Sequence, residues 1–185
     1  MKCLYVGVLL LIVSCSYHNK EKKFTDTATL TIDSLIDSSN KVFIQTKNVQ
    51  PAEIINFAQT LIGTPYLYAS TDPSKGFDCS GFITYVFNHF NIEVPRSSVE
   101  FTDVYHEVPL QQAKPGDLIL FTGTDSTIRI VGHMGIVVSN LNDNIAFIHS
   151  TSGKADGVTI TPLNSYYMGR FIKVVRVFPG NDLTL

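Results

Sequence analysis

The spacing of apolar residues changes near Pro115, and this change constrains the fold more than any other feature of the sequence. Upstream, two stretches repeat apolar residues at helical spacing. One starts at Pro51 and stops before Gly63, and the other follows Asp78, a suitable N-cap. Their apolar stripes are Ile54, Ile55, Ala58, Leu61 and Ile62, and then Phe82, Ile83, Val86, Phe87 and Phe90. A third, short helix is expected near Ser97.

Downstream of Pro115, the chain consists of short β-branched or aromatic runs separated by Gly, Asn, Asp or Pro. The expected strands are residues 117–121, 133–139, 145–150, 158–161 and 171–178. Because helices come first and strands later, the sequence predicts an α+β fold. We expect N-terminal helices packed on a central antiparallel sheet of about five strands.

The first residues have the features of an export signal. Lys2 supplies a positive charge, and the apolar run from Leu4 to Val13 is too short to span a bilayer. The run ends in Ile12-Val13-Ser14-Cys15, which resembles a bacterial lipobox. The resemblance implies a signal peptide over residues 1–14, lipidation of Cys15, and a membrane-anchored protein of the cell envelope. An ordinary secretory signal and a buried N-terminal strand are the alternatives.

Residues 15–50 are rich in Ser, Thr, Lys, Asp and Asn, and we expect them to form a polar tether. Residues 29–36 contain enough apolar side chains for a short ordered element within it. The folded domain is expected over residues 51–185. The formal net charge is -2, and no basic stripe is interleaved with aromatic residues. Nucleic-acid binding is therefore excluded as the main function.

The three cysteines of the chain are Cys3, Cys15 and Cys79. Signal cleavage removes Cys3 and lipid occupies Cys15, so Cys79 is left as the free thiol. It falls at the predicted start of the second helix, where backbone N–H groups and the helix dipole stabilise a thiolate or an oxyanion. Gly81 leaves room there for a substrate backbone. The alternative is an inert core cysteine, although the apolar stripe begins only at Phe82.

Two of the five histidines, His133 and His149, fall on neighbouring predicted strands. If residue 139 pairs with residue 143 across the polar link 140–142, the two histidines lie directly opposite each other, with Cβ atoms about 5 Å apart. A shift of two residues leaves them diagonal neighbours. One histidine then suits the role of base and the other orients it. His18, His89 and His106 are expected at the surface.

A metal site made by Cys79 with both histidines is the alternative to a catalytic group. The sequence offers no close-spaced ligand pair for it, such as Cys-x-x-Cys, so we expect neither a metal nor another cofactor.

Several short blocks, in this order, resemble the signatures of the NlpC-type cell-wall peptidases. They are Gly63-Thr64-Pro65-Tyr66, Phe77-Asp78-Cys79-Ser80-Gly81-Phe82, Pro95-Arg96-Ser97-Ser98, Pro115-Gly116-Asp117-Leu118-Ile119-Leu120-Phe121, Gly132-His133-Met134-Gly135-Ile136-Val137 and Phe147-Ile148-His149-Ser150. The resemblance implies a papain-like fold and cleavage of peptidoglycan stem peptides between the γ-carboxyl of D-Glu and the following diamino acid. It also implies that Cys79 is the nucleophile, His133 the base and His149 the orienting residue.

The resemblance further implies a set of substrate-binding residues. Tyr66 matches a tyrosine near the thiol, Asp78 and Ser80 match residues that hold a free substrate amine, and Ser98 matches a serine of the same pocket. The chain departs from the family pattern at residues 69–70, 99–101 and 122–131, which border the expected cleft. We expect a monomer whose partners are wall peptides and, through the lipid, a membrane.

Two other functions remain open from the sequence. A papain-like amide transferase or hydrolase with a non-wall substrate would use the same residues, because fold does not determine function. A non-catalytic lipoprotein that binds wall peptides is the second, and intact Cys79, His133 and His149 argue against it.

Overall fold

The computed structural model describes residues 41–182 of the chain. The predicted signal peptide, the lipidation site Cys15 and most of the predicted tether lie outside the described residues. Within residues 41–182, no helix is both long enough and apolar enough to cross a membrane.

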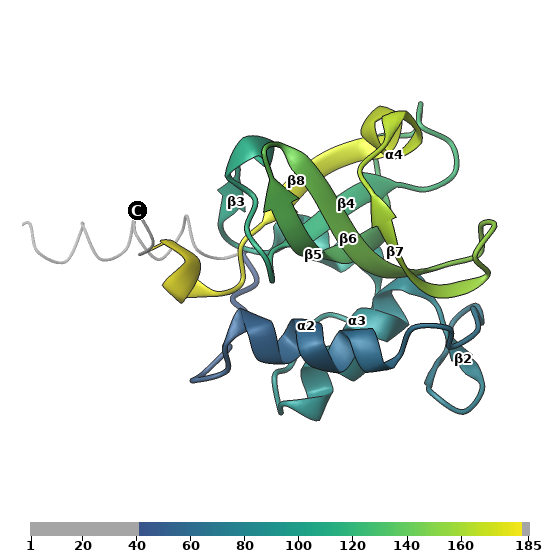
Figure 1. Cartoon of the computed structure of the whole chain (residues 1–185), viewed down its shortest axis with the longest axis horizontal. Coiled ribbons are helices and arrows are strands. Elements are labelled where there is room, and N and C mark those ends of the chain that lie inside the picture. Colours follow the sequence, from purple (N-terminus) through teal and green to yellow (C-terminus); the bar gives the residue numbers. More distant parts are fainter. Residues whose placement is uncertain (1–40, 183–185) are drawn as a thin grey trace, which may run out of the picture. The chain divides into compact units, whose positions relative to one another are not determined.

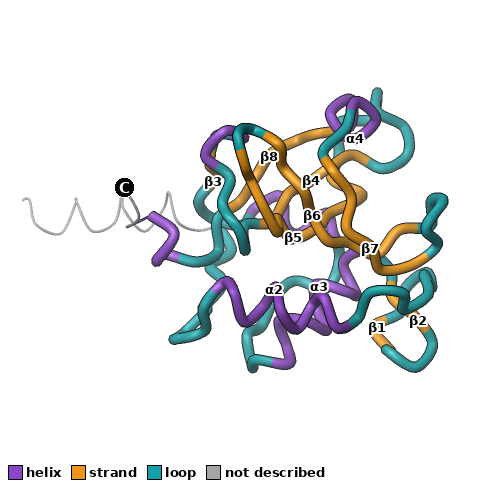
Figure 2. The backbone as a smooth tube through the Cα atoms, in the orientation of Figure 1, coloured by secondary structure: helices purple, strands orange, loops and turns teal. Residues whose placement is uncertain are grey.

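The domain is built on a six-stranded antiparallel sheet with strand order β3-β8-β4-β5-β6-β7 (Figures 1 and 2). Its strands are β3 (Glu107–Val108), β4 (Leu118–Thr122), β5 (Val131–Leu141), β6 (Asn144–Thr151), β7 (Gly157–Pro162) and β8 (Phe171–Val175). The five predicted strands are all present, and the sixth is the two-residue edge strand β3. A separate two-stranded sheet joins β1 (Thr71–Asp72) to β2 (Gly76–Phe77).

Two helices pack against one face of the sheet, as the order of elements predicted (Figure 1). They are α2 (Pro51–Thr60) and α3 (Cys79–His89), and α3 contacts β5 and β6. Pro51 opens α2, where its missing N–H costs nothing, and Glu53 bonds back to the N–H of Gln50.

The remaining helices are short. The segment predicted as a helix near Ser97 is the 3-10 helix η1 (Ser98–Asp103). The others are η2 (Leu110–Gln112), α4 (Ser165–Arg170) and η3 (Pro179–Asp182), none of which was predicted. Among these, α4 matters for the site described below.

Both faces of the sheet are buried, because alternate residues of each strand enter different apolar clusters. Leu118 and Leu120 of β4 face the helices, whereas Ile119 and Phe121 face the opposite side. The helix-side cluster also contains Ile54, Ala58, Phe82, Ile83, Val86, Phe87, Met134, Ile136 and Ile148. The far-side cluster contains Val137, Phe147, Tyr167 and Val174.

Residues 41–50, which the sequence assigned to the tether, pack on the domain. The N–H of Val42 donates to the carbonyl of Asp103 at 2.8 Å, and the N–H of Tyr105 donates to the carbonyl of Val42 at 2.9 Å. Val42, Ile44 and Val49 contact the helix-side cluster. Packed structure therefore extends to Val42, nine residues before the boundary expected at residue 51.

The hairpin between β5 and β6 differs from the predicted register. Leu141 pairs with Asn144, so the turn is the two residues Asn142 and Asp143, with φ values of 52° and 64°. Positive φ at both positions suits a tight hairpin turn, and Asn and Asp tolerate it well. A bulge between Val137 and Ser139 shifts the register once more. The predicted pairing of residues 139 and 143 is wrong for these reasons.

Candidate active site

Cys79 is the first residue of α3, as the sequence predicted. Its Sγ lies 3.9 Å from the carbonyl oxygen of Gly132 on β5, so the sulfur sits where the helix meets the sheet. Asp78 caps the helix by accepting the N–H of Gly81 at 2.6 Å. The helix start and the sheet together therefore determine where the thiol lies.

The electrostatic environment of the Cys79 thiol differs from the expectation. Burial and then the charge of Asp78 raise the pKa of Cys79 to about 11. The backbone N–H groups of Cys79 and Ser80, which provide the helix-start effect that the sequence suggested, act in the opposite direction, and so does the N–H of Met134 on β5. In the substrate-free site this stabilisation of the thiolate is outweighed by burial, so the thiol form dominates at neutral pH.

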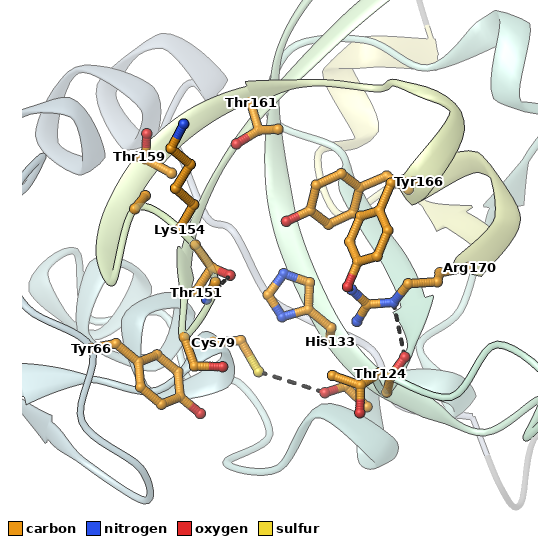
Figure 3. Close-up of a pocket in the computed structure, with 16 residues that line it drawn as sticks. Tyr66, Cys79, Thr124, His133, Thr151, Lys154, Thr159, Thr161, Tyr166 and Arg170 are labelled. Carbon is orange, nitrogen blue, oxygen red and sulfur yellow. Dashed lines mark hydrogen bonds between the residues drawn. The ribbon is translucent and has the colours of Figure 1, made fainter.

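His133 on β5 and His149 on β6 are joined by a hydrogen bond between Nε2 of His133 and Nδ1 of His149, 2.8 Å long. Their register makes them diagonal neighbours, since Ile136 pairs with Ile148. The placement directly opposite each other is therefore wrong, and the alternative shift of two residues is the one observed. Figure 3 shows the ring of His133 facing the side of the pocket that holds Cys79. Since Nε2 is engaged by His149, Nδ1 is the ring nitrogen left for the thiol.

Apolar surroundings keep both imidazoles uncharged. His149 is fully buried and His133 is 8% exposed, with the rings of Phe121, Phe147 and Tyr167 around them. Burial lowers the pKa of His149 to about 3, and burial is also the main reason why the pKa of His133 lies well below its ordinary value.

Gly135 makes the close packing of His149 possible. A Cβ atom at Gly135 would lie 2.8 Å from the carbonyl oxygen of Ile148 and 3.1 Å from Cβ of His149. No larger residue fits there without moving β6. The requirement for glycine at position 81 differs from the one proposed from the sequence. A Cβ atom added at Gly81 would collide with the backbone carbonyl of Ser70. Gly81 serves the packing of α3 against the preceding loop.

A cavity of about 980 Å³ opens beside these residues (Figure 3). Cys79, His133 and Tyr66 line one side, and Tyr66 points its hydroxyl toward the sulfur. Burial and then the charge of Cys79 raise the pKa of Tyr66. The loop after β4 reaches the rim through Gly123 and Thr124.

The cavity is cationic. Lys154, from the loop between β6 and β7, and Arg170 of α4 both line it, and none of the lining residues, all within residues 41–182, is acidic. Arg170 is 7% exposed and donates to the carbonyls of Thr122 and Gly123, each at 2.8 Å. In the part of the chain that the structure describes, it has no carboxylate partner. The charge of Arg170 also contributes to the lowered pKa values of both histidines.

Three predicted substrate residues lie outside the cavity lining. The Asp78 carboxylate is held by Arg96, with Nη2 2.7 Å from Oδ2. Ser80 donates to Asp78 at 3.2 Å and accepts from Arg96 at 3.1 Å. Ser98 opens η1. Substrate binding by these three residues stays a prediction, and the structure groups only Tyr66 with Cys79 and His133.

The sequence missed Thr161, Lys154, Tyr167 and Arg170. Thr161 on β7 lies with its Oγ1 2.9 Å from Nε2 of His149. Thr161 falls within a predicted strand, but the sequence does not show which residues lie beside it on the neighbouring strand. Arg170 and Tyr167 lie on α4, and a helix of six residues is too short to show a periodic pattern.

The other histidines play no part in this cluster. His89 stacks on Phe57 with ring centroids 3.7 Å apart, and His106 contacts Asp182 at 3.4 Å. His18 lies outside the described residues. Within residues 41–182, no three His, Cys, Asp or Glu side chains form a group that could hold a metal ion. In addition, Nε2 of His133 and Nδ1 of His149 are hydrogen-bonded to each other.

These elements define a class of protein: a papain-like fold with a cysteine at the start of a helix and histidines on the sheet. The NlpC/P60 family profile matches residues 63–177. The chain belongs to the NlpC/P60 family, which confirms both the resemblance and the expected fold.

Several known proteins are similar to the chain. It is 30% identical over 156 residues to the gamma-DL-glutamyl hydrolase of Bacillus subtilis (strain 168). The aligned region covers 84% of this chain and 37% of that protein. It is 29% identical over 178 residues to the murein DD-endopeptidase MepS/murein LD-carboxypeptidase of Escherichia coli (strain K12). Here the aligned region covers 93% of this chain and 89% of that protein. The chain spans about a third of the length of the first curated relatives that it matches.

Solved structures of NlpC/P60 proteins have a similar fold. An NlpC/P60 family protein of Bacillus cereus ATCC 10987 superposes with a TM-score of 0.63 at 29% identity, over 73% of this chain and 42% of that one. A protein of Staphylococcus aureus subsp. aureus Mu50, described as similar to lipoprotein, NLP/P60 family, has a TM-score of 0.60 at 28% identity, over 80% and 47%.

Proposed function

We propose that this protein is a cysteine peptidase that hydrolyses amide bonds in peptidoglycan stem peptides. The observation that carries the proposal is the hydrogen bond between Nε2 of His133 and Nδ1 of His149, which leaves Nδ1 of His133 for Cys79 in the same cavity. A nucleophile, a base and a residue that orients the base are the parts that thiol-dependent amide hydrolysis requires.

In this mechanism, Sγ of Cys79 attacks the scissile carbonyl carbon while Nδ1 of His133 accepts the thiol proton. Backbone N–H groups at the start of α3 stabilise the oxyanion. The leaving amine takes the proton from His133, and a thioester remains on Cys79. Water, deprotonated by His133, then hydrolyses the thioester and releases the carboxylic acid. His149 holds His133 in the required orientation throughout.

The charge of the cavity supports an anionic substrate. Lys154 and Arg170 line it without any acidic neighbour among the lining residues, so a peptide that carries free carboxylates fits better than a basic one. Stem peptides carry such carboxylates. Two relatives are named for action on γ-DL-glutamyl and murein bonds, which supports the same substrate class.

For the bond itself, we propose the link between the γ-carboxyl of D-Glu and the following diamino acid. Tyr66 would contact the substrate beside the thiol, Asp78 and Ser80 would hold its free amine, and Ser98 would line the same pocket. A second candidate is the DD-cross-link or LD-bond of murein. It is favoured by the match to the relative MepS, which extends over 89% of that protein's length.

The proposal includes location. Lipidation at Cys15 would place the enzyme in the cell envelope, next to its substrate. Detection of a diacylglyceryl adduct on Cys15 by mass spectrometry of the protein from membranes tests this part.

Product analysis on defined substrates tests the activity. The purified protein is incubated with a tripeptide L-Ala-γ-D-Glu-diamino acid and, separately, with a cross-linked muropeptide dimer, and products are identified by mass spectrometry. Release of L-Ala-D-Glu supports the γ-D-Glu bond, whereas conversion of dimer to monomer supports the DD-cross-link. Cys79→Ala and His133→Ala are expected to abolish cleavage, and unchanged cleavage by Cys79→Ala would disprove the mechanism.

A further inference from the structure

Thr161 extends the chain of hydrogen bonds that starts at His133. Nε2 of His149 lies 2.9 Å from Oγ1 of Thr161, and Nδ1 of His149 lies 2.8 Å from Nε2 of His133. Each contact joins diagonal neighbours on adjacent strands, since Phe147 pairs with Thr161. The line His133–His149–Thr161 therefore runs across β5, β6 and β7.

The direction of these hydrogen bonds follows from what His133 must do. A base that faces the thiol through Nδ1 needs a lone pair on that atom, so the proton of neutral His133 is on Nε2. Nδ1 of His149 must then accept, which places the His149 proton on Nε2. That N–H can donate only to an acceptor, and the Oγ1 of Thr161 is the acceptor within reach.

The opposite direction is chemically possible and would be unproductive. If the hydroxyl of Thr161 donated to His149, the His149 proton would be on Nδ1 and would donate to Nε2 of His133. The His133 proton would then be on Nδ1, pointing at the thiol it should deprotonate. A valine at position 161 can accept no hydrogen bond, so in Thr161→Val the productive arrangement leaves the buried Nε2–H of His149 without its acceptor.

We propose that Thr161 is a positioning residue that sets the tautomer of His149, and through it the tautomer of His133. The inference rests on the proposed function, because it assumes that His133 is the base. It predicts that the main effect is on the chemical step, because Thr161 acts through His149 on the state of the base, although its side chain also lines the cavity.

The burial of His149 makes the effect large enough to measure. His149 is fully buried, so water cannot easily take the place of the Thr161 hydroxyl as the acceptor for its Nε2–H. We expect Thr161→Val to lower kcat for stem-peptide cleavage by about tenfold to a hundredfold, with KM within about twofold of the wild type. Thr161→Ser keeps the hydroxyl and should restore most of the rate.

The tautomers can be observed without any substrate. Long-range ¹H–¹⁵N NMR correlations of histidine-labelled protein should show Nε2–H tautomers for both His133 and His149 in the wild type, and an increased Nδ1–H population in Thr161→Val. Thr159→Val is the matched control, because Thr159 pairs directly with His149 in the register, although His149 bonds to Thr161. It should leave the His149 tautomer unchanged.

The outcomes separate the two proposals. An Nδ1–H tautomer of His149 in the wild type, or an unchanged tautomer and kcat in Thr161→Val, overturns the role of Thr161. If the wild type cleaves no stem peptide, the proposed function fails, while the NMR comparison still decides whether Thr161 sets the tautomer.

Discussion

Arg96 holds Asp78 through both ends of its guanidinium group, with Nη2 2.7 Å from Oδ2 and Nη1 3.1 Å from Oδ1. The same carboxylate accepts the N–H of Gly81 and caps α3. Because α3 begins with Cys79, this ion pair couples the segment after α3 to the start of the helix that carries the thiol. Its bidentate geometry also restricts the orientation of the cap.

Removal of this ion pair should destabilise the domain. The side chain of Asp78 is only 10% exposed, so Arg96→Ala leaves a poorly hydrated carboxylate. We expect a loss of about 1–2 kcal/mol in the free energy of unfolding, limited by the 43% exposure of Arg96, in urea denaturation. Lys75→Ala breaks an exposed ion pair with Asp72 and should leave the free energy of unfolding almost unchanged. Equal losses in both variants would contradict the structural role of Arg96.

A methyl group at position 135 should impair catalysis. In Gly135→Ala the new Cβ would lie 2.7 Å from Cδ2 of Phe147 and 2.8 Å from a backbone oxygen that cannot rotate away. Displacement of β6 would move His149 relative to His133, so we expect kcat to fall by about tenfold or more. Gly169→Ala is the control, because no atom lies within 4 Å of its added Cβ. Wild-type kcat in Gly135→Ala would show that the sheet can adapt.

The raised pKa of Cys79 predicts how its alkylation depends on pH. With a pKa of about 11, the thiolate fraction rises about tenfold per pH unit through the neutral range. The lowered pKa of His133 leaves that imidazole uncharged at neutral pH, so it offers no positive charge to the thiolate. The rate of modification by iodoacetamide in the substrate-free protein should therefore climb without a plateau between about pH 6 and 9. A plateau at or below neutral pH would indicate a preformed thiolate–imidazolium pair.

Charge reversal at Lys154 tests the preference for anionic peptides. Lys154→Glu introduces a negative charge into a cavity whose lining residues include no other acid. We expect KM for a carboxylate-bearing stem peptide to rise about three- to tenfold, with kcat little changed, in steady-state assays. Lys47→Glu carries the same charge change but Lys47 does not line this cavity. If both variants raise KM equally, the effect is one of net charge.

Much of the fold could be predicted because local patterns agreed with tertiary structure. The apolar stripe of α3 and the β-branched run of β5 each have the period of the element they form. Cys79 was placed correctly because Asp78 is a strong N-cap signal that depends on neighbouring residues alone.

Features that depend on distant residues were missed or misjudged. The register of His133 and His149 depended on a two-residue turn at Asn142–Asp143 and on a bulge, neither of which the apolar pattern reveals. The pKa of Cys79 depends on how deeply the sheet and the following loops bury it. The pairing of Asp78 with Arg96 spans 18 residues and was likewise not visible in the sequence.

The division of the reactive groups between the helix layer and the sheet has a consequence for refolding. Cys79 belongs to α3, whereas its proposed base lies on β5, more than fifty residues later in the chain. Forming α3 and the β5–β6 hairpin separately would bring no thiol to an imidazole. Recovery of peptidase activity after dilution from denaturant should therefore lag behind the return of secondary structure, and report the time at which the two layers dock.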